Sequence, residues 1–168
     1  VISVVADVNE IARLGINFPW VKPAGCPRCG QSLWWHGFVP AYFSCLAEAV
    51  LLRRLRCPCC RSVHRLKPAG YWRRFRSSIT LITQTISHRW DSGRWRRDQP
   101  RPRQRQWWRR LQRMAEAVVG LAAGSAVAAF ESLLRQDFIP VSLSFKRDNS
   151  GAGPPPYRSV SLPPLRSE

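Results

Sequence analysis

The sequence predicts an α+β protein, with a small three-stranded sheet built around paired cysteines and a helical region after it. Two Cys-x-x-Cys pairs lie within residues 26–60, and β-prone residues fill the stretch between them. After Pro68 the apolar residues recur at helical spacing. From Ser144 onward proline, glycine, serine and arginine predominate, which is typical of a disordered tail.

Charge is concentrated in the middle of the chain. The 168 residues carry a formal net charge of +17, from 27 Lys and Arg against 10 Asp and Glu. The whole excess lies between Arg53 and Arg113, where 19 basic residues face two acids, Asp91 and Asp98. Such a basic module indicates a polyanionic partner, nucleic acid before an anionic membrane. The length excludes a self-contained polymerase, kinase or full-length transposase.

The N-terminal residues predict a short helix over Val1–Leu14, because valines and isoleucines recur on one side of it and Gly15 ends it. We expect Phe18-Pro19-Trp20 to pack this helix on the sheet. Hydrophobic and β-prone residues predict three strands, near 31–38, 49–56 and 61–66.

Two cysteine knuckles, Cys26-Pro27-Arg28-Cys29 and Cys57-Pro58-Cys59-Cys60, predict one structural zinc ion bound by Cys26, Cys29, Cys57 and Cys60. In each knuckle the proline pre-sets a turn that aims two thiolates at one point. The alternative is a pair of disulfides or unrelated thiols. No secretory signal is visible at the N-terminus, so a disulfide framework is not expected.

The remaining cysteines and histidines have secondary roles in this hypothesis. Cys59 follows Cys57 too closely for good chelate geometry, so Cys60 is preferred as the ligand. Cys45 is expected to be a buried apolar residue. His36 and His64 each follow a knuckle, and each is expected either to hydrogen-bond a ligand sulfur or to be a half-exposed strand residue.

A first helix is predicted from Phe75 to Trp90, where apolar residues recur at i, i+4, i+7 and i+11. Ser77 or Ser78 is expected to cap its start, and Gly93 to end it. The β-branched residues in this stretch leave a strand open as the competing interpretation.

A second helix is predicted from Arg103 to about Val119, after a break at Gln99–Pro102. One stripe carries the apolar residues Trp107, Leu111, Met114, Ala115 and Val118. The opposite face carries Arg105, Arg109 and Arg113, flanked by Gln106 and Gln112. A helix packed by one face and lined by arginine on the other suits a major-groove reader, so a helix-turn-helix is expected with this helix as its recognition element.

The predicted nucleic-acid contacts all lie in the basic region: Arg73, Arg74, Arg101, Arg103, Arg105, Gln106, Arg109, Arg110 and Arg113. A solvated helix surface is the alternative, although this face lacks interleaved acids and therefore repels itself. Trp95, Trp107 and Trp108 offer a single-strand stacking mode, but Trp107 is expected in the core between the two helices.

An apolar stretch at 117–130 is too short for a membrane span and is expected to form a buried helix or a helical dimer contact. The chain is thereby divided into 1–20 (N-terminal helix and lead-in), 21–70 (zinc ribbon), 71–119 (helix-turn-helix-like region), 120–143 (apolar helix and short strand) and 144–168 (disordered tail).

Several segments together resemble a known family. They are CPRCG at 26–30, WWHGF at 34–38, RRLRCPCCRSVHRLKP at 53–68, GYWRRF at 70–75 and RPRQRQWWRRL at 101–111. Residues 18 to 115 resemble the N-terminal DNA-binding region of bacterial insertion-element transposases, and short stand-alone zinc-ribbon proteins encoded near such elements. The resemblance implies the four zinc ligands above and a helix-turn-helix after Pro68. Cys59 is an extra thiol, and 116–168 looks unlike a transposase catalytic domain.

The sequence therefore predicts a zinc-stabilised, sequence-specific DNA-binding protein associated with a transposable element and lacking the catalytic domain. It is expected in the bacterial cytoplasm, associated with the nucleoid, with double-stranded DNA as partner and a second copy or a separate transposase subunit as further partners. No enzyme activity and no small-molecule substrate are expected, since no phosphate loop, nucleophile elbow or His-Glu metal motif is present. The alternatives are an RNA-binding zinc ribbon that stacks Arg and Trp on bases, and a small membrane-associated basic protein.

Overall fold

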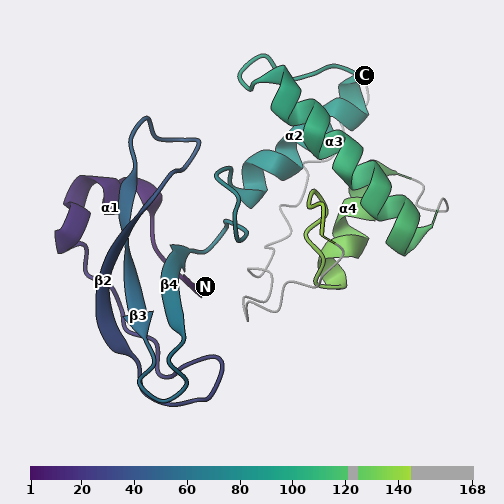
Figure 1. Cartoon of the computed structure of the whole chain (residues 1–168). Helices are drawn as coiled ribbons and strands as arrows, with labels where there is room; N and C mark the ends of the chain where they lie inside the picture. Colours follow the sequence, from purple (N-terminus) through teal and green to yellow (C-terminus); the bar gives the residue numbers. More distant parts are fainter. Residues whose placement is uncertain (121–124, 145–168) are drawn as a thin grey trace, which may run out of the picture.

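The computed structural model describes residues 1–120 and 125–144, which form an α+β protein of two lobes (Figure 1). The sheet lobe contains β1 (Ile2–Val4), α1 (Val8–Leu14), β2 (Trp34–Ala41), β3 (Val50–Arg56) and β4 (Val63–Pro68). The helical lobe contains α2 (Ile79–Ser92), α3 (Arg101–Met114) and α4 (Ala126–Arg135). A 3-10 turn at Gly15–Asn17 follows α1, and a π turn at Ala115–Val119 follows α3.

The sheet has four strands rather than the predicted three, in the order β1-β4-β3-β2, because the N-terminal β1 adds to the edge of β4. Strand β3 runs antiparallel to both of its neighbours, β2 and β4, and these three strands confirm the three predicted ones, displaced by one to three residues at their starts. Between Trp35 and Phe38 the register of β2 shifts, and Gly37 within this irregularity has a φ of 77°. A glycine suits this position because a left-handed backbone is costly for residues with a Cβ.

The predicted helix over Val1–Leu14 is wrong in its first half. Ile2–Val4 forms β1 and pairs parallel to β4, with Ile2 opposite Leu66. The helix begins only at Val8, because the Asp7 carboxylate accepts a hydrogen bond of 3.2 Å from the N–H of Asn9 and so caps the start. The pairing with β4, whose residues lie 64 positions later in the chain, outweighs the local helical pattern.

Two hydrophobic clusters hold the sheet lobe together. The first joins Val8 and Ile11 of α1 to Phe43, Val50 and Leu52, with Phe18 and Trp20 packed against it as predicted. The second lies around the cysteines and is formed by Cys26, Leu33, Leu55, Cys57 and Leu66. The sheet therefore carries α1 toward one end and the cysteines toward the other.

The first predicted helix is confirmed as α2, with a shorter start. The Ser78 hydroxyl accepts a 3.1 Å hydrogen bond from the N–H of Leu81, and Gly93 ends the helix in the left-handed conformation (φ 65°). Both residues were predicted for these roles. The expected start at Phe75 is too early, because the N-cap Ser78 still has an extended backbone (φ −66°, ψ 155°) and the helix begins only at Ile79.

The second predicted helix is confirmed as α3, which begins at Arg101 rather than Arg103 and ends at Met114, because Ala115–Val119 forms a π turn in place of the predicted last turn. Pro102 lies in the first turn, where its missing N–H costs no hydrogen bond. Trp107, Leu111 and Met114 are buried against the other helices, as predicted for this stripe. With Ile82, Ile86, Phe130 and Leu133 they form the core of the helical lobe.

The stretch 117–130 is not one continuous helix. The π turn ends at Gly120 (φ 78°), and α4 starts afresh where the Ser125 hydroxyl accepts a 2.9 Å bond from the N–H of Ala128. Residues 136–144 contain turns and no strand, so the short strand expected there is absent from this described segment. The tail predicted for 144–168 lies, beyond Ser144, outside the described residues.

The segment 69–78 ties the two lobes together by hydrogen bonds. The N–H of Ala69 donates to the carbonyl of Val4, and the N–H of Ile79 donates to the carbonyl of Gly70, at 2.7 Å each. Lys67, which is only 3% exposed, donates its ammonium to the carbonyls of Trp72 and Phe75. This buried ammonium fixes the turn that leads from β4 to α2.

Candidate metal centre and nucleic-acid interface

The four predicted ligands converge on one point at the end of the sheet. The Sγ atoms of Cys26, Cys29, Cys57 and Cys60 all lie within 4.8 Å of one another. Cys26 and Cys60 are 3.6 Å apart, and Cys29 and Cys57 are 3.4 Å apart, distances that far exceed a disulfide bond. All six cysteines are free thiols, so the disulfide alternative is not observed.

The two knuckles repeat the same backbone geometry. The N–H of Cys26 donates to the carbonyl of Gln31 at 2.8 Å, and the N–H of Cys57 donates to the carbonyl of Ser62 at 2.9 Å. The residue after each second ligand is left-handed, with φ 75° at Gly30 and 57° at Arg61. Each knuckle thus turns back on itself and directs two sulfurs into the same space.

Four thiols in so small a volume cannot all ionise without a cation. Hydrogen bonds from the side chain and the N–H of Ser62 lower the pKa of Cys60 to about 6. The N–H of Cys60 acts to lower the pKa of Cys57, but burial and the sulfurs of Cys29 and Cys60 outweigh it and raise that pKa to about 11. Part of the cluster could therefore bind a metal ion as thiolate, and the remaining thiols would lose their protons on binding it.

Outside the four sulfurs, Ser62 and His64 complete the centre. The Ser62 hydroxyl lies 2.9 Å from the Cys60 sulfur and 2.8 Å from Nε2 of His64, which itself lies 3.4 Å from the Cys26 sulfur. His64 is buried, and the structure favours its sulfur-bonding role over that of a half-exposed strand residue. His36 is exposed and takes no such part. Nothing in the spacing of the sequence singled out Ser62.

The two other cysteines lie away from the cluster. Cys59 is exposed in the second knuckle, so Cys60 is the residue whose sulfur joins the other three. Cys45 is also exposed, with its sulfur 3.6 Å from the Tyr71 hydroxyl. The expectation of a buried Cys45 is wrong, because the loop between β2 and β3 runs over the surface.

The arginine face of α3 has the predicted form. Arg105, Arg109 and Arg113 are exposed, on the side of the helix opposite Trp107 and Leu111. Gln106 and Gln112 are exposed beside them. This face is therefore open to a partner along the length of α3.

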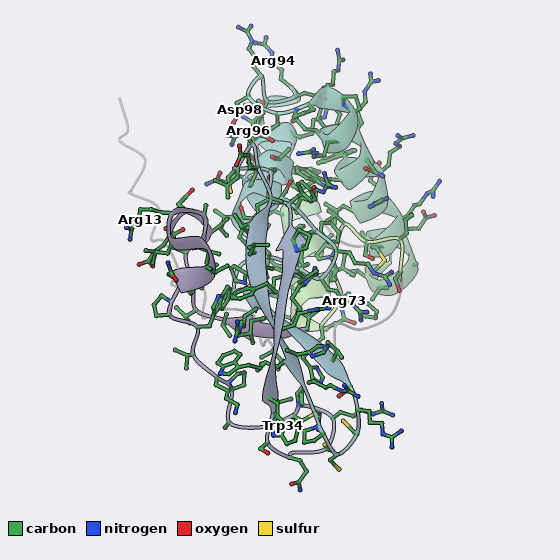
Figure 2. All side chains as sticks on the ribbon, turned by 60° about the vertical axis from the view of Figure 1, so that its left-hand side comes forward. Arg13, Trp34, Arg73, Arg94, Arg96 and Asp98 are labelled. Atoms are coloured by element: carbon green, nitrogen blue, oxygen red, sulfur yellow. The ribbon has the colours of Figure 1, made fainter. Side chains whose placement is uncertain are left out.

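The other predicted contact residues do not all share that face. Arg101 and Arg105 line a hollow at the start of α3, whereas a second hollow is lined by Arg74, Arg103, Gln106 and Arg110 among others. Arg110 is partly buried, its pKa is lowered by burial, and it donates to the carbonyl of Val141 at 3.5 Å. Arg73 is exposed on the connecting segment and lines neither hollow. In Figure 2 the labelled side chains of Arg73 and Arg94 lie far apart in the view, with Arg94 at the top.

Sequence reasoning missed two groups in which arginine meets tryptophan. The Arg53 guanidinium lies 4.8 Å from the Trp35 ring and 4.4 Å from the Phe38 ring on the sheet. The Arg89 guanidinium lies 4.4 Å from the Trp95 ring at the end of α2. In each group the chain reverses direction between the arginine and its aromatic partner. The sequence therefore indicates these contacts only through its alternation of aromatic and basic residues.

The basic region is almost unneutralised within the described residues. Among the described residues of the whole chain, the ion pairs are Arg13–Glu10, Arg96–Asp98 and Arg135–Glu131. Only Arg96–Asp98, at 2.6 Å, belongs to the segment from Arg53 to Arg113, and its two side chains are labelled together in Figure 2. The arginines of α3 therefore form no ion pair among the described residues.

Comparisons with protein families, with curated proteins and with solved structures found no match. The resemblance to insertion-element transposases accordingly stays a prediction. Across residues 1–120 and 125–144, no helix combines the length and apolar character needed to cross a lipid bilayer.

Proposed function

We propose that this chain is a zinc-stabilised protein that binds double-stranded DNA through the exposed face of α3. In this proposal α2 and α3 act as a helix-turn-helix-like pair, and the cysteine centre holds one zinc ion in a zinc ribbon. We further propose that the protein serves a transposable element and relies on a separate subunit for catalysis. The single observation that carries the proposal is the arginine face of α3, which is opposite a packed apolar stripe and forms no ion pair among the described residues.

The composition of the cysteine centre supports zinc. Four thiolates at one point are the ligand set of structural zinc sites, and all four positions would be filled by protein. Such a site leaves no open position for a substrate, so the metal would stabilise the sheet lobe rather than catalyse a reaction. Cys26, Cys29, Cys57 and Cys60 would hold the ion, while Ser62 and His64 would orient the sulfurs.

The dimensions of α3 support a groove reader. An α-helix with its side chains is about 10–12 Å wide and the major groove is about 12 Å wide, so one helix fills it. Arg105, Arg109 and Arg113 are spaced by about 6 Å along the axis, which presents a row of guanidinium groups to phosphates or guanine edges. Gln106 and Gln112 flank the row and have the amide geometry that pairs with adenine.

Mobility-shift titrations over a salt series test this function. With about six phosphates neutralised, log K should fall with log salt at a slope near about −5, and Arg109→Ala should reduce that slope by about 0.9. Arg13→Ala, an exposed arginine on α1 in the sheet lobe, is the matched control and should leave the slope unchanged. Affinity that does not respond to salt would rule the proposal out.

An RNA-binding function is the second candidate, and the sheet surface favours it. Trp34 is 62% and Trp35 39% exposed on the edge strand β2, and the Arg53 guanidinium lies 4.8 Å from the Trp35 ring. Exposed aromatic rings with arginine stack on unpaired bases, as single-stranded RNA requires. Competition of labelled duplex DNA by single-stranded RNA of equal length separates the two functions.

A further inference from the structure

We propose that the corner between α2 and α3 (residues 93–100) and the first turns of α3 bind one unpaired nucleotide of a DNA strand. The phosphate would lie among guanidinium groups and the base against Trp95 and Trp108. The protein would then prefer duplex DNA that carries a single-stranded extension. This inference rests on the proposed function, because the duplex is held by the neighbouring face of α3.

Two adjoining hollows form this site. The larger has a volume of about 550 Å³ and is lined by Arg89, Gly93, Arg94, Trp95, Arg101 and Arg105. The smaller has a volume of about 290 Å³ and is lined by Trp95, Arg105, Trp108 and Arg109. They share Trp95 and Arg105, and together they reach the size range of small-ligand pockets.

The larger hollow has the chemistry of a phosphate site. Four of its lining residues are arginines. Arg89 already donates to the Gly93 carbonyl and lies over the Trp95 ring, so Arg94, Arg101 and Arg105 supply the planar guanidinium groups that bind phosphate in a bidentate way. None of its lining residues is acidic, and the nearby Asp98 is occupied by two hydrogen bonds from Arg96 at 2.6 and 2.9 Å. The first residue of α3, Arg101, lines it too, so the positive end of that helix dipole adds to the attraction.

The smaller hollow has the chemistry of a base site. Its walls are two indole rings and two arginine side chains, with no carbonyl or carboxylate group among the lining side chains. The rings of Trp95 and Trp108 meet edge to face at 6.5 Å, and the Arg89 guanidinium lies 4.4 Å from Trp95. Bases stack on such aromatic and guanidinium surfaces without regard to sequence.

Hydrogen bonds hold the corner in place before any ligand arrives. Gln104 of α3 is fully buried, its amide donates to the carbonyls of Arg96 and Gln99 at 2.8 and 2.7 Å, and its oxygen accepts from the N–H of Arg96 at 3.0 Å. Gly93 makes the left-handed turn out of α2. A pocket fixed in this way loses little conformational entropy on binding.

The aromatic wall points to an unpaired nucleotide rather than to a phosphate of the duplex. A base inside a duplex is already stacked on both sides and presents only its edge, so it cannot use an indole face. Arg105 and Arg109 line the hollows and also belong to the outer face of α3. A strand leaving the duplex on that face can therefore enter the site directly.

Fluorescence anisotropy with two hairpins tests the inference. Both hairpins share one duplex, and one adds a four-nucleotide single-stranded extension. The extension should tighten binding about tenfold, as expected for one base stacked on an aromatic residue. Trp95→Ala should remove this preference and leave the Kd for the blunt hairpin unchanged. Trp90→Ala, an exposed tryptophan on α2 outside the hollows, is the matched control and should keep the preference.

The outcomes separate this inference from the proposed function. Equal affinity for the two hairpins, or a preference that survives Trp95→Ala, overturns the unpaired-nucleotide site while duplex binding stands. An extension of abasic sugars that binds as well as the normal one also overturns it, because phosphates alone would then explain the gain. If the wild-type protein binds the extended hairpin but not the blunt one, the proposed duplex function is refuted instead. Trp95→Phe, which keeps an aromatic ring, should retain most of the preference, and an unchanged Kd of Trp95→Ala for the blunt hairpin shows that this variant folds.

Discussion

Replacing Cys57 by serine should release the metal and unfold the cysteine end of the sheet lobe, whereas Cys59→Ser should do neither. The two residues lie in the same knuckle, so the substitutions are closely matched. Cys57 is 0% exposed, and its sulfur lies 3.4 Å from that of Cys29. Cys59 is exposed, and its sulfur is not among the four that converge.

The size of the expected effect follows from the small core around the cysteines. Three fully buried leucines, Leu33, Leu55 and Leu66, contribute about 1.5–3 kcal/mol each. A structural zinc contributes about 10–16 kcal/mol at neutral pH, which exceeds the leucines taken together. Without the metal this end of the sheet cannot stay ordered, whereas a surface change such as Cys59→Ser should shift the free energy of unfolding by less than about 0.5 kcal/mol.

Native mass spectrometry and hydrogen exchange measure both parts of this prediction. Wild type and Cys59→Ser should carry one metal ion per chain, and Cys57→Ser should carry none. Amides of β3 and β4 should lose protection in Cys57→Ser, while those of α2 and α3 keep theirs, because the helical lobe has its own core. One metal ion retained by Cys57→Ser, or lost by Cys59→Ser, would refute the four-sulfur centre.

Three further substitutions follow from the structure. Gln104→Leu should lower the stability of the helical lobe by about 2–4 kcal/mol in denaturant melts, because it leaves backbone groups of Arg96 and Gln99 unpartnered, and Gln112→Leu on the exposed face should not. Arg61→Gly should stabilise the metal-loaded protein by about 1 kcal/mol and so raise its thermal midpoint, because Arg61 has a left-handed backbone at the position where the first knuckle has glycine. A lower thermal midpoint would contradict this reasoning. Leu111→Ala should cost about 2–5 kcal/mol by denaturant melt yet leave the metal content measured by mass spectrometry unchanged, and metal loss would mean that the lobes fold as one unit.

The features that the sequence predicted well are governed by local chemistry. The spacing within each Cys-x-x-Cys knuckle determines a turn, and both knuckles direct their sulfurs to one point. Ser78 begins and Gly93 ends α2, as predicted, because helix capping depends on a few adjacent residues. The amphipathic stripe of α3 is equally local, and its burial follows the 3.6-residue period.

The features that the sequence did not predict depend on distant contacts. Ile2–Val4 becomes a strand only because β4 offers a free edge about 60 residues later. Trp95 packs between Arg89, which precedes it in the chain, and Trp108, which follows it. These contacts form only when α2 and α3 pack together, so the sequence alone does not show them. The exposed position of Cys45 likewise depends on how a surface loop closes over Tyr71.

The arginines of the helical lobe should give two salt responses of opposite sign. In the free protein they repel one another with little internal relief, since within the described part of the chain the arginines between Arg53 and Arg113 pair with an acid only at Arg96–Asp98. Added salt screens that repulsion and should raise the thermal midpoint of the free protein. In the complex the same charges displace counterions from DNA, so added salt weakens binding and removes the stabilisation that the ligand provides. Thermal melts with and without a saturating duplex should therefore converge as salt increases. Parallel curves would mean that the arginine face contributes neither to the instability of the free protein nor to binding.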